Sequence, residues 1–492
     1  MNPWFGLGLL FFYFSLLIWV SARTARGETD SQTFFVANRS SKWYLVAFGM
    51  IGTSLSGVTF ISVPGMVKAG NLHYLQIVLG YLIGYLVIAN VLMPLYYRLQ
   101  LVSIYTYLEQ RFGFWAYKTG AAFFILSRLL GSSARFFLVL SVLHQAIFRH
   151  FEIPFWLSVG IGLLLIWVYT WKGGIKTIVV TDTLQTFCML TAVFISLYFL
   201  SNTALKPGQS LNGFLTENPL ATIFNHDPVS KFFWIKQLLA GAFIAITMTG
   251  LDQDMMQKNL TCKSLGEAKK NMYWFSGILL LVNAAFLLLG LLLYAFAEQF
   301  GIPLPEKSDQ LFPLLALQYF PIWLGLLFLM GIIAATYAST DSALAALTTS
   351  FCFDFLNFEK RKETERQKLK FRVHLGMSAL IWVVVVGFYF LNEGSLINTV
   401  FDIAGITYGP LLGLYAMGLY TRIRPADRAI PLLCIAAAGI SWLLKANSKW
   451  LLNGYEFGFE ILLVNGLISF CLLWVSSAFS EKNREIQPST NH

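Results

Sequence analysis

The stretch TSLSGVTFISVPG, residues 53–65, lies inside an apolar run that extends from residue 44 to residue 68. A run of this length can cross about 30 Å of hydrocarbon, which takes about 20 helical residues. The run is interrupted by Gly57 and ends in Pro64-Gly65, and both residue types weaken a continuous helix. The pattern predicts a membrane-spanning helix that is broken within the bilayer.

Further apolar runs of this kind follow along the chain. The thirteen runs lie at about 4–22, 44–68, 72–97, 118–148, 153–171, 175–201, 233–256, 272–299, 320–354, 371–391, 396–420, 426–444 and 457–480. The first run has no basic start and no small-x-small cleavage site after it, so we interpret it as a retained helix. We expect an all-α polytopic membrane protein with thirteen transmembrane helices.

The composition of the 492 residues agrees with this class. Hydrophobic residues make up 57%, charged residues 12%, and the mean hydropathy is +0.63. Because soluble domains carry about a quarter charged residues, a soluble enzyme, a disordered chain and a disulfide-stapled secreted domain are excluded. The scattered cysteines indicate neither a disulfide framework nor a zinc site. They are Cys188, Cys262, Cys352, Cys434 and Cys471.

The basic residues predict the orientation. With the N-terminus outside, the inner loops hold 25 Lys and Arg residues, Lys258 among them, and the outer loops hold 6. Cytoplasmic loops carry this excess, so we expect a multi-pass protein of the cell membrane with a cytoplasmic C-terminus. The net charge of +10 then reflects topology, and we expect no nucleic-acid partner. The basic run 360–372 is interpreted as a solvated inner loop.

An internal repeat is indicated by a second interrupted run. The run 233–256 contains Gly241 and Gly250, and five runs lie between 44 and 201 and five between 233 and 420. An odd number of spans inverts the second copy, and paired interrupted helices mark a mid-membrane binding site in transporters. Glycines are also common in ordinary membrane helices, so the pattern alone leaves both interpretations open.

Five motifs in order resemble the sodium:solute symporter family across residues 5–425. They are TSLSGVTFISVPG (53–65), GGIKTIVVTDTLQ (173–185), GLDQDMMQ (250–257), AATYASTDS (334–342) and AGITYGPLLGLY (404–415). The resemblance implies a LeuT-type 5+5 inverted repeat and sodium-coupled import of a small polar solute. The expected parts are 1–43 (first helix and inner loop), 44–201 (repeat one), 202–232 (outer loop), 233–421 (repeat two) and 422–492 (two extra helices and inner tail).

The resemblance implies a first sodium site between the broken helix and the ninth run. The carbonyls of Gly52, Leu55 and Thr336 and the hydroxyls of Ser339 and Thr340 would be the ligands, since hard cations take oxygen ligands. The alternative is that these hydroxyls bond only to carbonyls of their own helix.

A second sodium ion is implied by some relatives. Asp182 with the hydroxyls of Ser339 and Ser342 matches that motif, but Ala343 stands where those relatives offer another hydroxyl. A carboxylate inside a span is costly and usually functional. The alternative is that Asp182 belongs to a polar network near the inner mouth, so one or two sodium ions remain open.

The substrate residues follow from the sialic-acid transporters of the family, to which the motifs are most similar. There, an arginine in the fourth span holds the substrate carboxylate, and Arg135 matches it; its alternative is an ion pair with an internal acid. The expected hydroxyl partners are Ser54, Ser56 and Thr59, and Gln76 is a further candidate. We therefore expect an organic anion such as a sialic or sugar acid.

Other solutes stay open. Sugar transporters of the family place Asn and Tyr where this chain has Ala245 and Met248, which argues against a hexose. A neutral sugar or polyol and a monocarboxylate are the remaining alternatives. The roles of the intramembrane acids Asp341, Asp252 and Asp402 are undecided; Asp341 could tune the ion site or pair with Arg128.

Other functional classes find little support. The chain has no HExxH metal motif and no nucleophile elbow, so we expect no enzyme. A transporter-like sensor would need a signalling domain, and the tail after residue 480 is a dozen polar residues. No repeated filter motif indicates a channel. The expected partners are a small solute, sodium and the lipid bilayer, with no obligatory protein partner evident.

Overall fold

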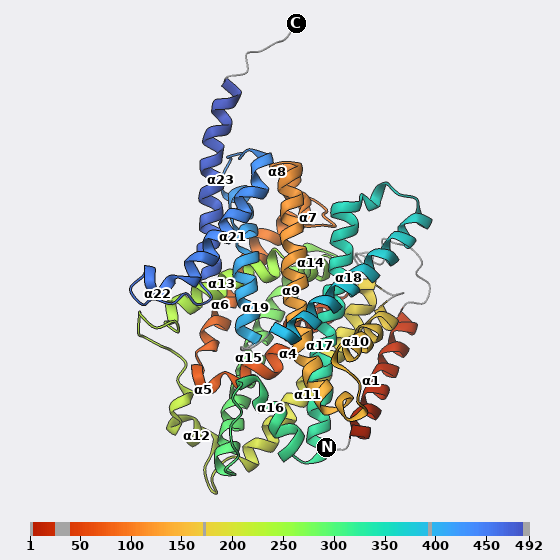
Figure 1. Cartoon of the computed structure of the whole chain (residues 1–492), viewed down its shortest axis with the longest axis vertical. Helices are drawn as coiled ribbons and strands as arrows, with labels where there is room; N and C mark the ends of the chain where they lie inside the picture. The colour runs from red at the N-terminus through yellow and green to blue at the C-terminus, as the bar shows by residue number, and fades with distance from the viewer. Residues whose placement is uncertain (1–2, 25–39, 171–173, 392–395, 486–492) are drawn as a thin grey trace.

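The computed structural model describes residues 3–24, 40–170, 174–391 and 396–485 (Figure 1). These residues form helices joined by turns, and the described part of the chain contains no β-strand. The helices of at least six residues are α1 (Pro3–Thr24), α3 (Trp43–Ser54), α4 (Gly57–Gly65), α6 (Tyr74–Val87), α7 (Met93–Arg98), α8 (Thr106–Arg111), α9 (Phe114–Ala146), α10 (Phe155–Thr170), α11 (Gly174–Thr203), α12 (Leu211–Glu217), α13 (Trp234–Ala245), α14 (Gln253–Asn259), α15 (Leu265–Gln299), α17 (Ile322–Ser350), α18 (Glu363–Leu391), α19 (Leu396–Thr407), α20 (Gly409–Tyr420), α21 (Ile430–Ala446) and α23 (Ile461–Glu485).

These helices confirm an all-α membrane architecture. Among the described residues, 8 helices are long and apolar enough to span a bilayer, and up to 11 spans result if each of three bent pairs counts as one. Two shorter apolar helices, Phe155–Thr170 and Ile461–Ser477, lie where two further spans are expected. The number thirteen and the boundaries of the repeats stay predictions.

The two expected breaks are present at the start of each group of five spans. Helices α3 and α4 are bent by 56° at Leu55 and Ser56, whose backbones leave the helical region. Gly57 follows directly, and a Cβ there would lie 2.2 Å from a methyl carbon of Val139 and 2.6 Å from Thr336 Oγ1. Glycine therefore lets α4 begin in contact with α9 and α17.

The second break is sharper. The helix α13 continues through a π-helical turn, η5 (Ile246–Gly250), and meets α14 at an angle of 70°. Asp252 begins α14 as its N-cap, because its carboxylate accepts hydrogen bonds from the backbone N–H groups of Asp254 and Met255. The helix α14 runs on to Asn259, three residues beyond the expected end of this span.

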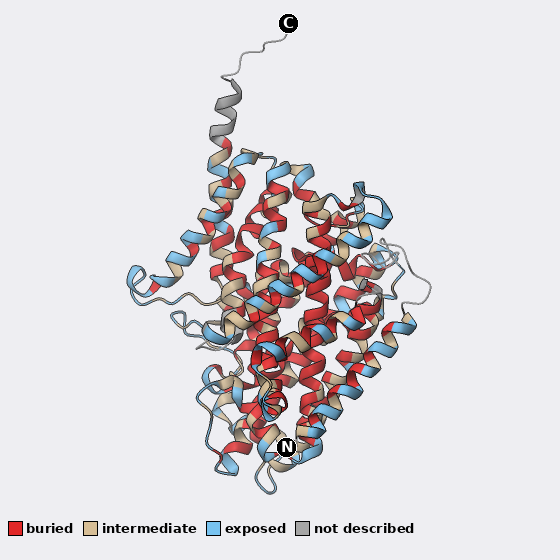
Figure 2. Cartoon of the chain, turned by 45° about the vertical axis from the view of Figure 1, so that its right-hand side comes forward, coloured by how far each residue is buried: buried red, intermediate tan, exposed pale blue. Residues whose placement is uncertain are grey.

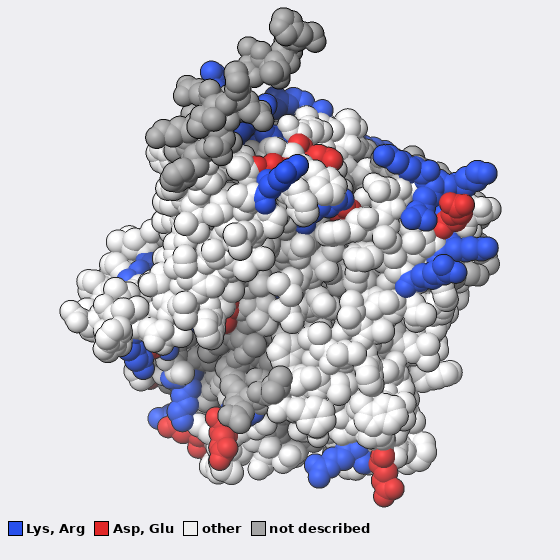
Figure 3. Space-filling model, turned by 45° about the horizontal axis from the view of Figure 1, so that its top comes forward, with Lys and Arg blue, Asp and Glu red and all other residues white. Residues whose placement is uncertain are grey.

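Buried residues fill the centre of the molecule, and exposed residues lie on its outside (Figure 2). Aromatic side chains face outward, for example Phe11, 78% exposed, and Phe390, 77% exposed, as lipid contact requires. Figure 3 shows broad uncharged surface with Lys and Arg gathered mainly toward one end. One correction concerns the basic run 360–372: α18 begins at Glu363, so most of this run is the first part of a helix instead of a loop.

Candidate functional site

A cavity of about 90 Å³ lies between the two broken helices. Its walls come from the α3–α4 break, α6, α9, the η5 turn with the adjoining ends of α13 and α14, α15 and α19. The lining residues that carry the following argument are Ser54, Ser56, Thr59, Arg128, Arg135, Ala245, Met248, Thr249 and Asn283. Because the first break and the helical turns on either side of the second break line this space, a ligand there would contact both expected repeats.

Arg135 brings a cation into this cavity without an acidic partner. It lies on α9, lines the cavity and is partly buried. In the described part of the chain, no carboxylate lies within ion-pair distance of its guanidinium. An arginine in an apolar span needs an anion, so the expected alternative, a structural ion pair with an internal acid, finds no support.

The neighbouring arginine shows what such an ion pair looks like. Arg128 lies two turns before Arg135 on α9 and forms an ion pair with Asp254, and its Nη1 is 3.7 Å from Asp252 Oδ2. The Tyr408 hydroxyl donates a hydrogen bond to Asp252 at 2.5 Å. The charge of Arg128 is therefore neutralised by the acids at the start of α14, and Asp252 acts as a packing partner of Arg128 and Tyr408. Arg135 is left as the cation that a ligand in the cavity can contact.

The three expected hydroxyl partners line the cavity, and Gln76 does not. Ser54, Ser56 and Thr59 all line the cavity at the break. The Gln76 side chain instead donates to the carbonyl oxygens of His73, at 3.0 Å, and Phe232, at 3.2 Å, and accepts from a backbone N–H in the outer loop. The structure thus uses Gln76 to hold the outer loop and does not bring it into the cavity.

Three of the five expected ligands of the first sodium site, those of Thr336, Ser339 and Thr340, lie within about one turn of α17. The Ser339 and Thr340 hydroxyls both donate to the Thr336 carbonyl oxygen at 2.9 Å. The end of α3 lies against the same turn, since Thr53 Oγ1 is 3.4 Å from the Ala338 carbonyl oxygen. Both hydroxyls therefore bond to a carbonyl of their own helix, as the alternative interpretation expects. Donating a hydrogen bond leaves the oxygen lone pairs available to a cation that approaches from the break between α3 and α4.

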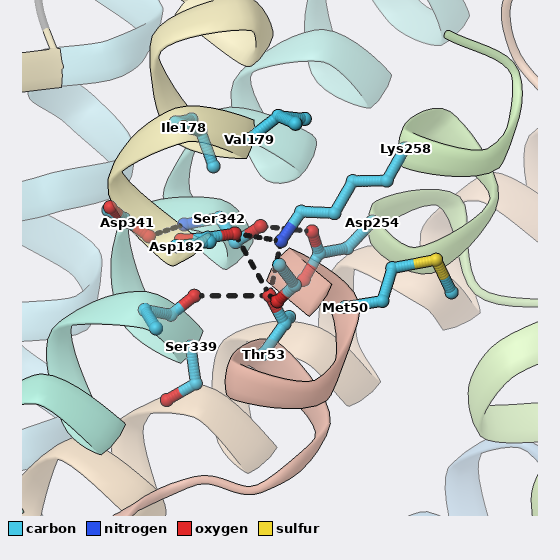
Figure 4. Close-up of polar contacts among 12 residues, drawn as sticks. Met50, Thr53, Ile178, Val179, Asp182, Asp254, Lys258, Ser339, Asp341 and Ser342 are labelled. Atoms are coloured by element: carbon cyan, nitrogen blue, oxygen red, sulfur yellow. Dashed lines mark hydrogen bonds and ion pairs between the residues drawn. The ribbon is translucent and has the colours of Figure 1, made fainter. Parts of the chain in front are cut away.

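The surroundings of Asp182 differ from the expectation. Its carboxylate forms a buried ion pair with Lys258 of α14, with 2.5 Å between Nζ and Oδ2, and the exposed fractions are 1% for Lys258 and 0% for Asp182. Thr53 also donates to Asp182 Oδ2 at 3.1 Å. Figure 4 shows the Lys258 side chain extending from α14 toward both residues. Counting Lys258 among the inner-loop residues was therefore wrong.

The two remaining intramembrane acids, Asp341 and Asp402, also have partners in the structure. Asp341 does not pair with Arg128; it accepts hydrogen bonds from the Tyr169 hydroxyl at 2.7 Å and from the Ser342 N–H at 2.5 Å. Asp402 pairs with Lys445 at a partly exposed position. Asp341 thus anchors α10 to α17, and Asp402 joins α19 to α21.

Several cavity residues were not anticipated. Asn283 is an amide inside an apolar helix and could have been found as a polar residue in the run 272–299. Thr249 lies in the η5 turn, and three tyrosines of α6 complete the wall. Aromatic residues in apolar spans are too common to stand out in a sequence. These tyrosines are Tyr74, Tyr81 and Tyr85.

Comparisons with known proteins find sodium-coupled transporters. The chain is 28% identical over 449 residues to a putative sodium-dependent multivitamin transporter of Drosophila melanogaster, covering 87% of this chain and 72% of the relative. It is 25% identical over 464 residues to the sodium/sialic acid symporter NanT of Aliivibrio fischeri, covering 91% and 89%. A substrate-bound, outward-open sodium-coupled sialic acid symporter superposes with a TM-score of 0.82 at 17% identity, covering 96% of this chain and 98% of the other.

The family model described as "Sodium:solute symporter family" matches residues 34–422, which span both broken helices, α9 and α17. This match includes every residue placed in the cavity and around Asp182. The chain therefore belongs to the sodium:solute symporter family.

Proposed function

We propose that this symporter imports a small organic anion whose carboxylate binds Arg135, with a sialic or sugar acid as the leading class. The observation that carries the proposal is the Arg135 guanidinium, which faces the cavity without an acidic partner. A guanidinium can hold a carboxylate by two parallel hydrogen bonds. The sialic acid symporter relatives support the same class.

The rest of the cavity suits a hydroxylated anion. The first N–H groups of α4 have no partner within the helix, and a helix N-terminus favours negative charge. The hydroxyls of Ser54, Ser56 and Thr59 and the Asn283 amide add donors and acceptors. These groups can bind the hydroxyls of a sugar acid.

A hexose fits this cavity less well. Ala245 and Met248, where sugar transporters of the family are expected to carry Asn and Tyr, both line the cavity. The departures from the sugar pattern therefore face the ligand. A site built to bind a polar group rejects an analogue that lacks it, and here the strongest polar group is a cation.

Sodium binding and substrate binding are coupled because their expected ligands lie at the same break, between α3 and α4. Sodium ligands are expected from the carbonyls of Gly52 and Leu55, and substrate ligands from Ser54 and Ser56, all within the last turn of α3 and the break that follows it. A sodium ion that orders this turn also places the substrate ligands, so each ligand raises the affinity for the other by the same factor. Sodium entry down its gradient then drives solute uptake.

The membrane orientation is part of the proposal. The N-terminus lies outside and the C-terminus in the cytoplasm of the cell membrane, as the excess of basic residues in the inner loops supports. Figure 1 shows that α1 begins near the end of the molecule opposite to the end of α23.

The function is tested with purified chain in proteoliposomes. Uptake of sialic acid, a sugar acid, a monocarboxylate, a neutral polyol and glucose is measured with an inward sodium gradient and with an equal potassium gradient. We expect sodium-dependent uptake of an acid and none of the polyol or glucose. Sodium-dependent uptake of a neutral solute alone would contradict the proposal.

Thr340→Ala tests the first sodium site. The substitution removes one expected ion oxygen, so the sodium concentration for half-maximal uptake should rise several-fold. Thr170→Ala is the matched control, because the Thr170 hydroxyl also bonds to a carbonyl of its own helix, that of Ile166 at 2.8 Å. Unchanged sodium dependence in Ser339→Ala/Thr340→Ala would reject the site.

A further inference from the structure

Lys258 is the buried cation that the family resemblance did not anticipate. Its ammonium donates to the Thr53 hydroxyl as well as to Asp182 Oδ2, and all three side chains are buried. The three come from different elements, α14, α3 and α11. The ammonium is therefore held by the same kinds of oxygen, a carboxylate and a hydroxyl, that a sodium ion takes.

The hydroxyls that were expected beside Asp182 point elsewhere. Ser342 donates to Asp254 Oδ1 at 2.7 Å, and Ser339 donates to the Thr336 carbonyl oxygen. Ala343 contributes no oxygen. Of the expected second-site ligands, Asp182 alone holds a cation, and that cation is the lysine (Figure 4).

We propose that the Lys258 ammonium permanently fills the place of a second sodium ion at Asp182, so that this transporter binds and moves one sodium ion per cycle. The inference rests on the sodium coupling of the proposed function and specifies its stoichiometry. The lysine is attached to α14, so its charge stays in the protein when the transported sodium leaves. It supplies the local charge balance that a second ion would otherwise supply.

The competing arrangement uses the other carboxylate oxygen. Asp182 Oδ1 is buried and has no hydrogen-bond partner in the described part of the chain. A sodium ion on this oxygen would share one carboxylate with the ammonium. Two positive charges on the two oxygens of one buried carboxylate repel each other strongly, because no water screens them. A direct count of bound sodium separates the two arrangements.

The experiment counts sodium on the purified full chain by equilibrium dialysis with radioactive sodium, which requires no substrate. We expect one ion per chain in the wild type. In Lys258→Met, the uncompensated carboxylate should recruit a second ion, which gives two. Lys258→Arg keeps the charge, and Lys258→Met/Asp182→Asn removes both partners, so each should bind one.

Two ions in the wild type, or one ion in Lys258→Met that elutes as a folded monodisperse protein, would overturn the inference. If Lys258→Met does not fold, the wild-type count decides alone. A wild-type count of zero would overturn the proposed sodium coupling together with this inference, whereas a count of two overturns only the inference.

Discussion

Arg135→Lys is expected to weaken the binding of a carboxylate substrate by at least about tenfold, and Arg135→Met by about 2–5 kcal/mol. Lysine keeps the charge but cannot form the two parallel hydrogen bonds of a guanidinium. Because Arg135 has no acidic partner among the described residues, removing its charge leaves no internal acid unpaired. The loss should therefore appear in substrate affinity while the fold persists.

The measurement is substrate titration by thermal shift in saturating sodium, with sialic acid and with its amide. The wild type should bind the acid and lose most of this affinity for the amide, whereas Arg135→Met should treat the two nearly alike. The stabilisation by sodium alone should be unchanged in both variants. Arg366→Lys, at a partly exposed pair with Glu363, is the matched control and should bind like the wild type.

Two outcomes would count against this assignment. Equal wild-type affinity for the acid and the amide would show that the carboxylate does not reach Arg135. A loss of stability without sodium or substrate in Arg135→Lys would indicate a structural role. In either case the neutral polyol or sugar alternative would gain support.

The broken helices could be predicted because their causes are local. Gly57 and Gly250 interrupt apolar runs, and Asp252 is an N-cap residue directly before α14. Arg135 stood out for a related reason, since a cation in an apolar run is conspicuous. Features that depend on a short stretch of sequence could therefore be predicted.

The misplaced residues depend on distant partners. Two of the three partners of Gln76 are backbone groups about 150 positions away in the outer loop, and nothing near Gln76 in the sequence specifies these two. Lys258 follows an apolar run and resembles any inner-loop lysine. It is buried because α14 turns by 70° and carries the side chain back toward α11. That angle follows from packing between helices, which hydropathy does not contain.

Asp182→Asn should destabilise the protein strongly, because it leaves the Lys258 ammonium buried without its anion. Removing one partner of a buried ion pair costs about 3–5 kcal/mol of unfolding free energy, whereas replacing both partners by uncharged residues can be nearly neutral. Asp182→Asn/Lys258→Met should therefore recover most of the stability that Asp182→Asn loses. The midpoint of thermal unfolding in detergent measures this order.

Asp402→Asn is the matched control, because Asp402 also pairs with a lysine, Lys445, but the two side chains are 46% and 23% exposed. An exposed pair contributes about 0–1 kcal/mol, so its midpoint should stay close to that of the wild type. Sodium adds a second distinction: it should stabilise Lys258→Met, which can bind a second ion beside Asp182, by more than it stabilises Asp182→Asn, which keeps the first site alone. If Asp182→Asn loses no more stability than Asp402→Asn, Lys258 and Asp182 are not a buried pair, and the lysine cannot stand in place of a second sodium ion.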